Sequence, residues 1–159
     1  MSIINKIRDI SLFKSLKDNE ELLSKIAEII VVKSFSRDTY IIKEGEIGNS
    51  MYILIKGTVS IEKTTSMGDV FSVAKLSETN NVYFGELALM DNDVRSASVI
   101  TITDTVCYMI NKDTFDNFCE DNPMIGYLII KDIAISLANK LRKTTNDNLV
   151  LINALCCDE

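Results

Sequence analysis

Two side chains of opposite charge stand in the segment FGELALMDNDVRSASV, residues 84–99. Glu86 follows Gly85 in an otherwise apolar run, and Arg95 comes nine residues later, with small residues directly after it. A guanidinium presents a rigid fork that matches phosphate oxygens. A carboxylate accepts hydrogen bonds from hydroxyl groups such as those of a ribose. The residue types therefore predict either a surface ion pair or a site that holds a phosphate beside a sugar.

The residues around these two charges are suited to close approach of a ligand. Gly85 can adopt backbone conformations that a Cβ atom would forbid. The ELAL that follows can form one helical turn, whose first N–H groups lack internal partners and can bind an anion. Ser96 and Ala97 are small, and the Ser96 hydroxyl can add a hydrogen bond. The segment therefore favours a phosphate-binding loop.

Composition excludes several other kinds of site. The chain has 159 residues, a net charge of −6 and no histidine. Without histidine, His-based acid–base catalysis and most transition-metal sites are excluded, so we expect neither an enzyme nor a metal site. The negative charge argues against nucleic acid as a direct partner, and the one short basic cluster, Lys140, Arg142 and Lys143, is interpreted as a solvated helix face. The sequence shows no signal peptide and no apolar run of about 18 residues, which predicts a cytoplasmic protein without a membrane partner.

The four cysteines form no CxxC pair. Cys107 and Cys119 lie in apolar patterns and are predicted to be buried, reduced thiols. Cys156 and Cys157 are adjacent near the C-terminus. They could form a disulfide between two chains or remain free thiols, and a cytoplasmic location favours free thiols.

The pattern of apolar residues changes twice along the chain. Residues 19–30 carry a helical stripe, and short β-branched or aromatic runs separated by turn signals then continue to residue 110. Eight such runs at close spacing predict an all-β roll or barrel. We expect one domain over residues 1–159, with N-terminal helices in 1–30, a β-roll in 31–110 and C-terminal helices in 111–159. The eight predicted strands are VVKSF, TYIIK, MYILI, TVSIEK, VFSVAKL, VYF, ASVITI and TVCYMI.

The last segment predicts a short helix over 112–121 and a long one from Pro123 to about Ala154, capped by Asn122. The long helix would span about 45 Å, more than the β unit covers, so its exposed seam predicts a homodimer. Thr144 and Asn148 in the seam could either fix its register or contact something bound beside it. The seam residues, alternately four and three apart, are Ile130, Ala134, Leu137, Leu141, Thr144, Asn148, Leu151 and Leu155.

FGELAL and RSASV together resemble the phosphate-binding cassette of the cyclic-nucleotide-binding domain family. The stretch EGEIGNSMYILIKGTVSI, residues 44–61, resembles the strand–turn–strand signature of that family, with Gly45, Gly48 and Gly57 at its glycine positions. We expect these three glycines to permit tight turns between the strands. LFKSL and KDTFDNFCEDNPMI resemble its N-terminal helical segment and its connection to the last helix. The resemblance covers about residues 10–153 and implies a double-stranded β-helix, or jelly-roll, with flanking helices.

The resemblance also implies a ligand, cAMP or cGMP, and no metal. The last helix is similar to that of catabolite activator protein-like regulators, in which two hydroxyls reach the adenine rings of the two chains; Thr144 and Thr145 fall at that pair and favour cAMP. Ser96 leaves the base open, because its hydroxyl could serve the phosphate or a guanine. The implied ligand-binding residues are Phe84, Gly85, Glu86, Leu87, Ala88, Arg95, Ser96, Ala97, Thr144 and Thr145.

The sequence departs from those regulators in two places. The run SETNN replaces a glycine turn before the cassette, and Asn80 or Asn81 is expected to take the left-handed conformation instead. The sequence also shows no helix-turn-helix segment after the long helix. We therefore expect a sensor or regulatory module that signals through its last helix to an effector protein of unknown identity. The alternative is an interaction and dimerisation module that no longer binds nucleotide.

Overall fold

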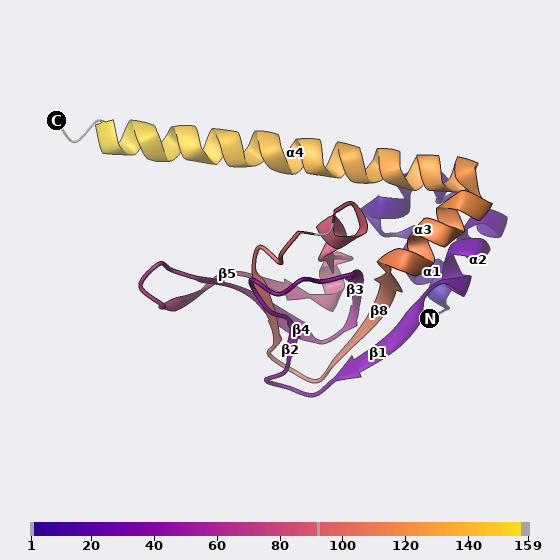
Figure 1. Ribbon diagram of the computed structural model, residues 1–159, viewed down its shortest axis with the longest axis horizontal. Coiled ribbons are helices and arrows are strands. Elements are labelled where there is room, and N and C mark those ends of the chain that lie inside the picture. Colours follow the sequence, from indigo (N-terminus) through magenta and orange to yellow (C-terminus); the bar gives the residue numbers. More distant parts are fainter. Residues whose placement is uncertain (1, 92, 157–159) are drawn as a thin grey trace.

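The computed structural model describes residues 2–91 and 93–156. Figure 1 shows a β-roll with short helices packed at one end and a long C-terminal helix that passes over both. The β4–β5 hairpin and the second half of the long helix both project from the body in the same direction. No helix in the described ranges has the length and apolar character needed to cross a membrane.

The N-terminal helices are short and capped. The Ser2 side chain accepts a hydrogen bond from the Asn5 N–H, and the Asn19 side chain accepts one from the Leu22 N–H. Such caps satisfy N–H groups that have no partner within the helix. The predicted helix over 19–30 is confirmed, with slightly narrower bounds. The three elements are α1 (Ile3–Arg8), the 3-10 helix η1 (Ser11–Leu16) and α2 (Glu20–Glu28).

All eight predicted strands form, and they make two antiparallel sheets of four strands each. The strand orders are β1-β8-β3-β6 and β2-β7-β4-β5. The predicted left-handed turn before the cassette is at Asn81, whose φ is 48°. The jelly-roll expectation is therefore confirmed. The strands are β1 (Val31–Phe35), β2 (Tyr40–Ile42), β3 (Ser50–Lys56), β4 (Thr58–Thr64), β5 (Val70–Ser77), β6 (Tyr83–Phe84), β7 (Ser98–Thr101) and β8 (Thr105–Asn111).

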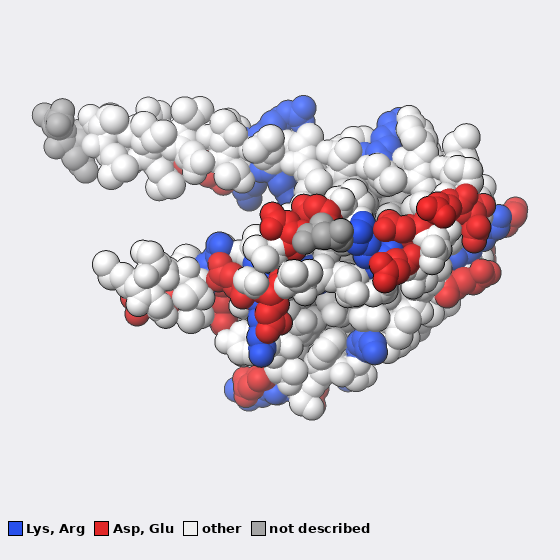
Figure 2. All heavy atoms as spheres, in the orientation of Figure 1, with Lys and Arg blue, Asp and Glu red and all other residues white. Residues whose placement is uncertain are grey.

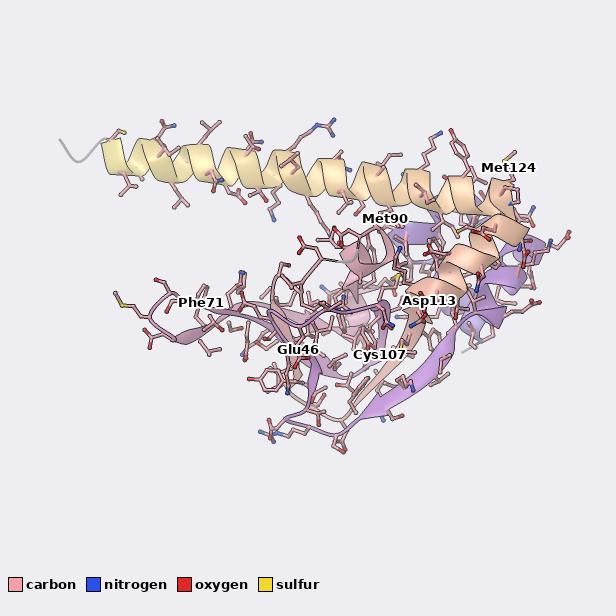
Figure 3. The ribbon with its side chains drawn as sticks, in the orientation of Figure 1. Glu46, Phe71, Met90, Cys107, Asp113 and Met124 are labelled. Carbon is pink, nitrogen blue, oxygen red and sulfur yellow. The ribbon has the colours of Figure 1, made fainter. Side chains whose placement is uncertain are left out.

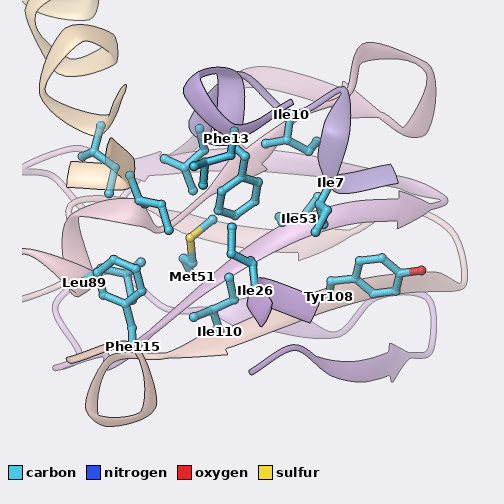
Figure 4. Packing of buried hydrophobic residues seen from close by; sticks show 14 of the residues in the cluster. Ile7, Ile10, Phe13, Ile26, Met51, Ile53, Leu89, Tyr108, Ile110 and Phe115 are labelled. Atoms are coloured by element: carbon cyan, nitrogen blue, oxygen red, sulfur yellow. The ribbon is translucent and has the colours of Figure 1, made fainter. Parts of the chain in front are cut away.

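The larger hydrophobic core lies between one sheet and the helices. Met51 and Ile53 of β3 and Ile110 of β8 are fully or almost fully buried there, against Phe13 and Phe115 from the helical elements (Figure 4). Burial of apolar side chains of this size contributes about 1.5–3 kcal/mol each. This core fixes the sheet that carries β3 and β6, and β6 leads directly into the cassette.

A smaller core between the sheets includes Cys107. Burial raises the pKa of the Cys107 thiol to about 12, so the thiol stays protonated at neutral pH. Cys119 is only partly buried, and both thiols are free. Cys156 is a free, exposed thiol, while Cys157 lies outside the described residues.

Two helices follow the roll, α3 (Lys112–Asp121) and α4 (Pro123–Cys156). The expected Asn122 cap is wrong in detail, because the Asn122 side chain donates from Nδ2 to the Phe118 carbonyl. The first third of α4 buries one face against the helical core, and its carboxylate Asp132 accepts hydrogen bonds from the Ser15 N–H and hydroxyl at 2.7 and 2.8 Å. These bonds fasten η1 to α4.

The second half of α4 extends beyond the body. Figure 3 shows its side chains projecting on both sides with no neighbouring element against them. All five members of the predicted seam in this half are exposed, and its three leucines are Leu141 at 68%, Leu151 at 62% and Leu155 at 77%. The described chain therefore leaves an apolar stripe uncovered along this half of the helix.

Candidate cyclic-nucleotide site

A cavity of about 210 Å3 opens between the end of β6, the loop before β7 and the underside of α4. Its lining brings together, from the expected ligand-binding set, Phe84, Gly85, Glu86, Leu87, Ala88, Arg95, Ser96 and Ala97.

Gly85 sets the direction of the chain at this cavity. Its φ of 74° lies in the left-handed region, and a Cβ atom there would come within 2.9 Å of Arg95 and of Ile42. The 3-10 turn η3 (Glu86–Leu89) begins immediately afterwards, as predicted. The glycine is therefore required both for the backbone conformation and for space beside the guanidinium.

Arg95 is held in place by its main chain and its side chain together. Its N–H donates to the Glu46 carbonyl, and its carbonyl accepts from the Gly45 N–H, both at 2.9 Å. The guanidinium donates from Nη1 to the Gly85 carbonyl at 3.2 Å and from Nη2 to the Ser50 carbonyl at 2.5 Å. A guanidinium has five N–H donors, so these two bonds leave others for a ligand.

The electrostatic setting of Arg95 follows from this position. Burial lowers the pKa of the guanidinium from its ordinary value, and the nearby Tyr52 phenol raises it in part. Arginine has so high an intrinsic pKa that the group stays charged. A cation that is half removed from water and incompletely paired favours binding of an anion.

Gly48 serves a purpose that its sequence position did not reveal. Gly45 and Gly57 have positive φ, as tight turns require, whereas Gly48 does not. A Cβ atom at Gly48 would instead overlap the Arg95 guanidinium. Gly48 is therefore a space-making residue for Arg95, and the expectation of a turn glycine at this position is wrong.

Glu86 does not form the ion pair with Arg95 that its sequence left open. Its carboxylate, in a side chain only 10% exposed, accepts a 2.5 Å hydrogen bond from Lys140 Nζ of α4. The same Nζ lies 5.3 Å from the centre of the Tyr83 ring, a cation–π distance. The Tyr83 hydroxyl is 2.7 Å from the Ser136 hydroxyl, also on α4. Three contacts thus join α4 to Glu86 of the cassette and to Tyr83 just before it.

Sequence reasoning missed Lys140, because it was read as part of a solvated basic cluster. The Lys140 side chain is 55% exposed, as a solvated position would be, but its Nζ also pairs with the buried Glu86 carboxylate. It also missed the apolar walls that Ile42, Ile61 and Val99 add from three strands. Alternation within each strand could have placed these three on the inner face, but not beside one cavity.

The two threonines of the expected set lie elsewhere. Thr144 and Thr145 are exposed on α4, and neither lines the cavity. The Thr145 hydroxyl donates to the Leu141 carbonyl at 3.0 Å within the helix. The structure of the single chain therefore does not bring the threonines to the other eight residues.

Comparison with known proteins agrees with this geometry. The sequence profile of the cyclic nucleotide-binding domain matches residues 32–122. Human cGMP-dependent protein kinase 2 is 38% identical over 70% of this chain, and the cAMP-dependent protein kinase regulatory subunit of Candida albicans is 31% identical over 93%. The matched parts make up 14% and 32% of those two proteins. This chain therefore spans less than a third of the length of either relative.

Solved structures show the same architecture. The catabolite activator protein of Thermus thermophilus superposes with a TM-score of 0.78 at 23% identity, over 89% of this chain and 62% of that one. At 23% identity, the superposition shows that the two proteins share a fold. Membership of a family is shown by the profile match over residues 32–122. The chain belongs to the cyclic nucleotide-binding domain family. Within it, the chain is a regulatory domain related to those of cAMP- and cGMP-dependent protein kinases.

Replacing Gly48 by Ala tests its space-making role. The new methyl group will force the guanidinium off its two carbonyls, and we expect the free energy of unfolding to fall by about 2–4 kcal/mol in urea titrations. Gly68→Ala is the control, because it adds a methyl group in open space at positive φ and should cost about 1 kcal/mol. In an Arg95→Ala background the Gly48→Ala cost should largely vanish. Equal costs in both backgrounds would contradict the role.

Proposed function

We propose that this chain is a sensor module that binds a 3′,5′-cyclic nucleotide, with Arg95 on the phosphate and Glu86 on a ribose hydroxyl. One observation carries the proposal: the guanidinium and the carboxylate line the same cavity without pairing with each other. The family match supports the ligand class. A cyclic nucleotide holds its phosphate and a ribose hydroxyl close together, which suits Arg95 and Glu86 in a lining that also includes Asp91, Asp93 and Lys140.

Binding is proposed to act on α4 through Lys140. Lys140 Nζ donates a hydrogen bond to the Glu86 carboxylate, the group that is proposed to accept the ribose hydroxyl. Lys140 also lines the cavity in which the nucleotide is proposed to bind. A nucleotide therefore has to displace or share this contact, which shifts the population of α4 positions. Signalling then requires an effector protein that reads the position of α4.

The preferred nucleotide is proposed to be cAMP. The Thr144–Thr145 pair supports this preference, because it matches the adenine-contacting hydroxyls of the resembling regulators. Cyclic GMP is the second candidate. Ser96 beside Arg95 and the 38% identity to a kinase named for cGMP favour it. We further propose a regulatory module without catalytic activity, acting in the cytoplasm.

A module that has lost nucleotide binding is the alternative function. A lapsed site would be expected to have lost one of its charged groups. Here Glu86 and Arg95 are both present, and their side chains are positioned by neighbouring elements. This retained charge pair favours a working site over a degenerate one.

A homodimer through α4 is proposed to complete the module. The second half of α4 exposes leucines at the predicted heptad positions. In a parallel pair of such helices these leucines would pack against each other. The pairing would also bring Thr144 and Thr145 of one chain near the other chain, where they could reach a bound base.

Arg95→Ala tests nucleotide binding directly. In calorimetric titrations with cAMP and with cGMP, we expect the wild-type Kd for the preferred nucleotide to be about 10 μM or lower. Arg95→Ala should weaken it about 100-fold, since hydrogen bonds to charged groups contribute about 1.5–3 kcal/mol each. Arg95→Lys, which keeps the charge but not the fork, should lose less. If neither cAMP nor cGMP gave binding heat with the wild type at millimolar concentration, the proposed function would be refuted.

Lys140→Met tests the competition for Glu86. Removing the lysine should tighten cAMP binding up to about fivefold, the value of a partly exposed ion pair. The gain should disappear with 2′-deoxy-cAMP, which has no hydroxyl to place on Glu86. Lys143→Met, one turn further along α4, is the matched control and should leave both affinities unchanged. An equal gain with both ligands would contradict the competition.

Leu141→Asp combined with Leu151→Asp tests the dimer. Both side chains are exposed in the single chain, so the substitutions should not harm folding. We expect sedimentation equilibrium to report a dimer for the wild type and a monomer for the variant, because buried carboxylates in the seam are costly. A wild-type monomer at 100 μM, or a variant that stays dimeric, would contradict the proposal.

A further inference from the structure

A second, larger hollow lies on the other side of Lys140. This groove of about 710 Å3 runs between η1 and the middle of α4. Its lysines come from both walls, Lys14 and Lys17 from η1 and its end, and Lys131, Lys140 and Lys143 from α4. We call it the lysine groove.

The lysine groove carries positive charge that the protein does not neutralise. It gathers five of the 17 Lys and Arg residues of a chain whose net charge is −6. Among the described residues, only Lys140 of these five has a carboxylate within 4.0 Å. The one acid in the lining, Asp132, is buried and turns its oxygens to Ser15. Figure 2 shows lysine and arginine atoms gathered midway along α4, above an acidic body surface.

The groove is pre-formed, because its walls are fastened together. The Asp132 bonds to Ser15 join η1 to α4, and Phe13, Ile129 and Ile133 beside them belong to the main core. Ser11 and Asn139 add polar groups to the lining. The two walls are therefore in place before a ligand binds, and the ordering needed on binding is mainly that of the exposed lysine side chains.

We propose that the lysine groove docks an acidic, extended peptide segment of a partner protein. Carboxylates of such a segment would pair with the lysines, and its peptide groups would meet the polar lining. A short segment confined to the groove feels mainly the nearby lysines, because charges are screened beyond about 8–10 Å. A nucleic-acid duplex or a flat anionic bilayer would also face the acidic surface around the groove, so both fit less well.

Lys140 connects this groove to the nucleotide cavity, since it lines both. This step rests on the proposed function. A nucleotide hydroxyl on Glu86 would release Lys140 to an acidic partner, and a partner on Lys140 would leave Glu86 open for the nucleotide. Because coupling between two binding sites is reciprocal, each ligand should tighten the other.

The first experiment measures binding of a fluorescein-labelled octaglutamate peptide by anisotropy at 50 mM salt, with no nucleotide present. We expect saturable binding by the wild type and at least tenfold weaker binding by the double variant Lys14→Glu/Lys131→Glu. The control, Lys33→Glu/Lys75→Glu, makes the same change of net charge at exposed positions on β1 and β5 and should change the affinity less than twofold.

Three results would overturn the docking proposal. They are no peptide binding by the wild type, equal losses in the two double variants, and tighter binding of a single-stranded oligonucleotide or of phosphatidylserine vesicles that Lys14→Glu/Lys131→Glu abolishes. Tighter binding of the oligonucleotide or of the vesicles would assign the groove to nucleic acid or to an anionic lipid surface instead of a peptide.

The coupling is tested by repeating the titration with saturating cAMP. We expect the peptide affinity to rise about two- to fivefold in the wild type and to stay constant in Lys140→Met. Unchanged affinity in the wild type, with cAMP bound, would overturn the coupling. Because the peptide titration alone needs no nucleotide, failure of the groove and failure of the nucleotide site give separate results.

Discussion

A half-buried guanidinium that must be held without being neutralised is the constraint on which this structure depends. Arg95 is fixed by two backbone carbonyls, from Ser50 at the start of β3 and from Gly85 after β6. Carbonyls orient the cation but bring no opposing charge, so its attraction for an anion remains. The absence of side chains at Gly48 and Gly85 leaves the space in which the group lies. The pairing of β3 with β6 sets the distance between the two carbonyls.

The second charge of the site is handled differently. Glu86 is almost fully buried and needs a partner when no ligand is bound, since an unpaired buried carboxylate is costly. Lys140 supplies the partner from α4, while Tyr83 and Ser136 hold the helix and the cassette together beside it. The lysine that pairs with this buried carboxylate is thus carried by α4, the element proposed to move. The proposed response to a nucleotide would therefore act on a contact that also stabilises the fold.

The sequence predicted the local features well, because short-range rules determine them. Alternating apolar residues and turn signals predicted all eight strands, and the SETNN run predicted the left-handed residue that the structure places at Asn81. The features that it did not predict come from tertiary packing. Lys140 and Glu86 lie 54 residues apart, and nothing near either residue indicates the other. Gly48 was read as a turn residue because only the folded structure shows the guanidinium against it. Thr144 and Thr145 were placed in the ligand-binding set by the resemblance alone, and the described chain leaves both exposed on α4, outside the cavity lining.

The helix α4 has 34 residues, and its contact with the cassette through Lys140 lies near its middle. This position has a mechanical consequence. Its first third is clamped in the helical core, and the part after Lys140 extends for about 24 Å at 1.5 Å per residue. A stiff rod clamped at one end works as a lever. A tilt of about 10° at Lys140 would displace the far end by about 4 Å, roughly three quarters of the pitch of a helix. An ångström-scale event at a single carboxylate would thereby become a movement large enough for another protein to detect.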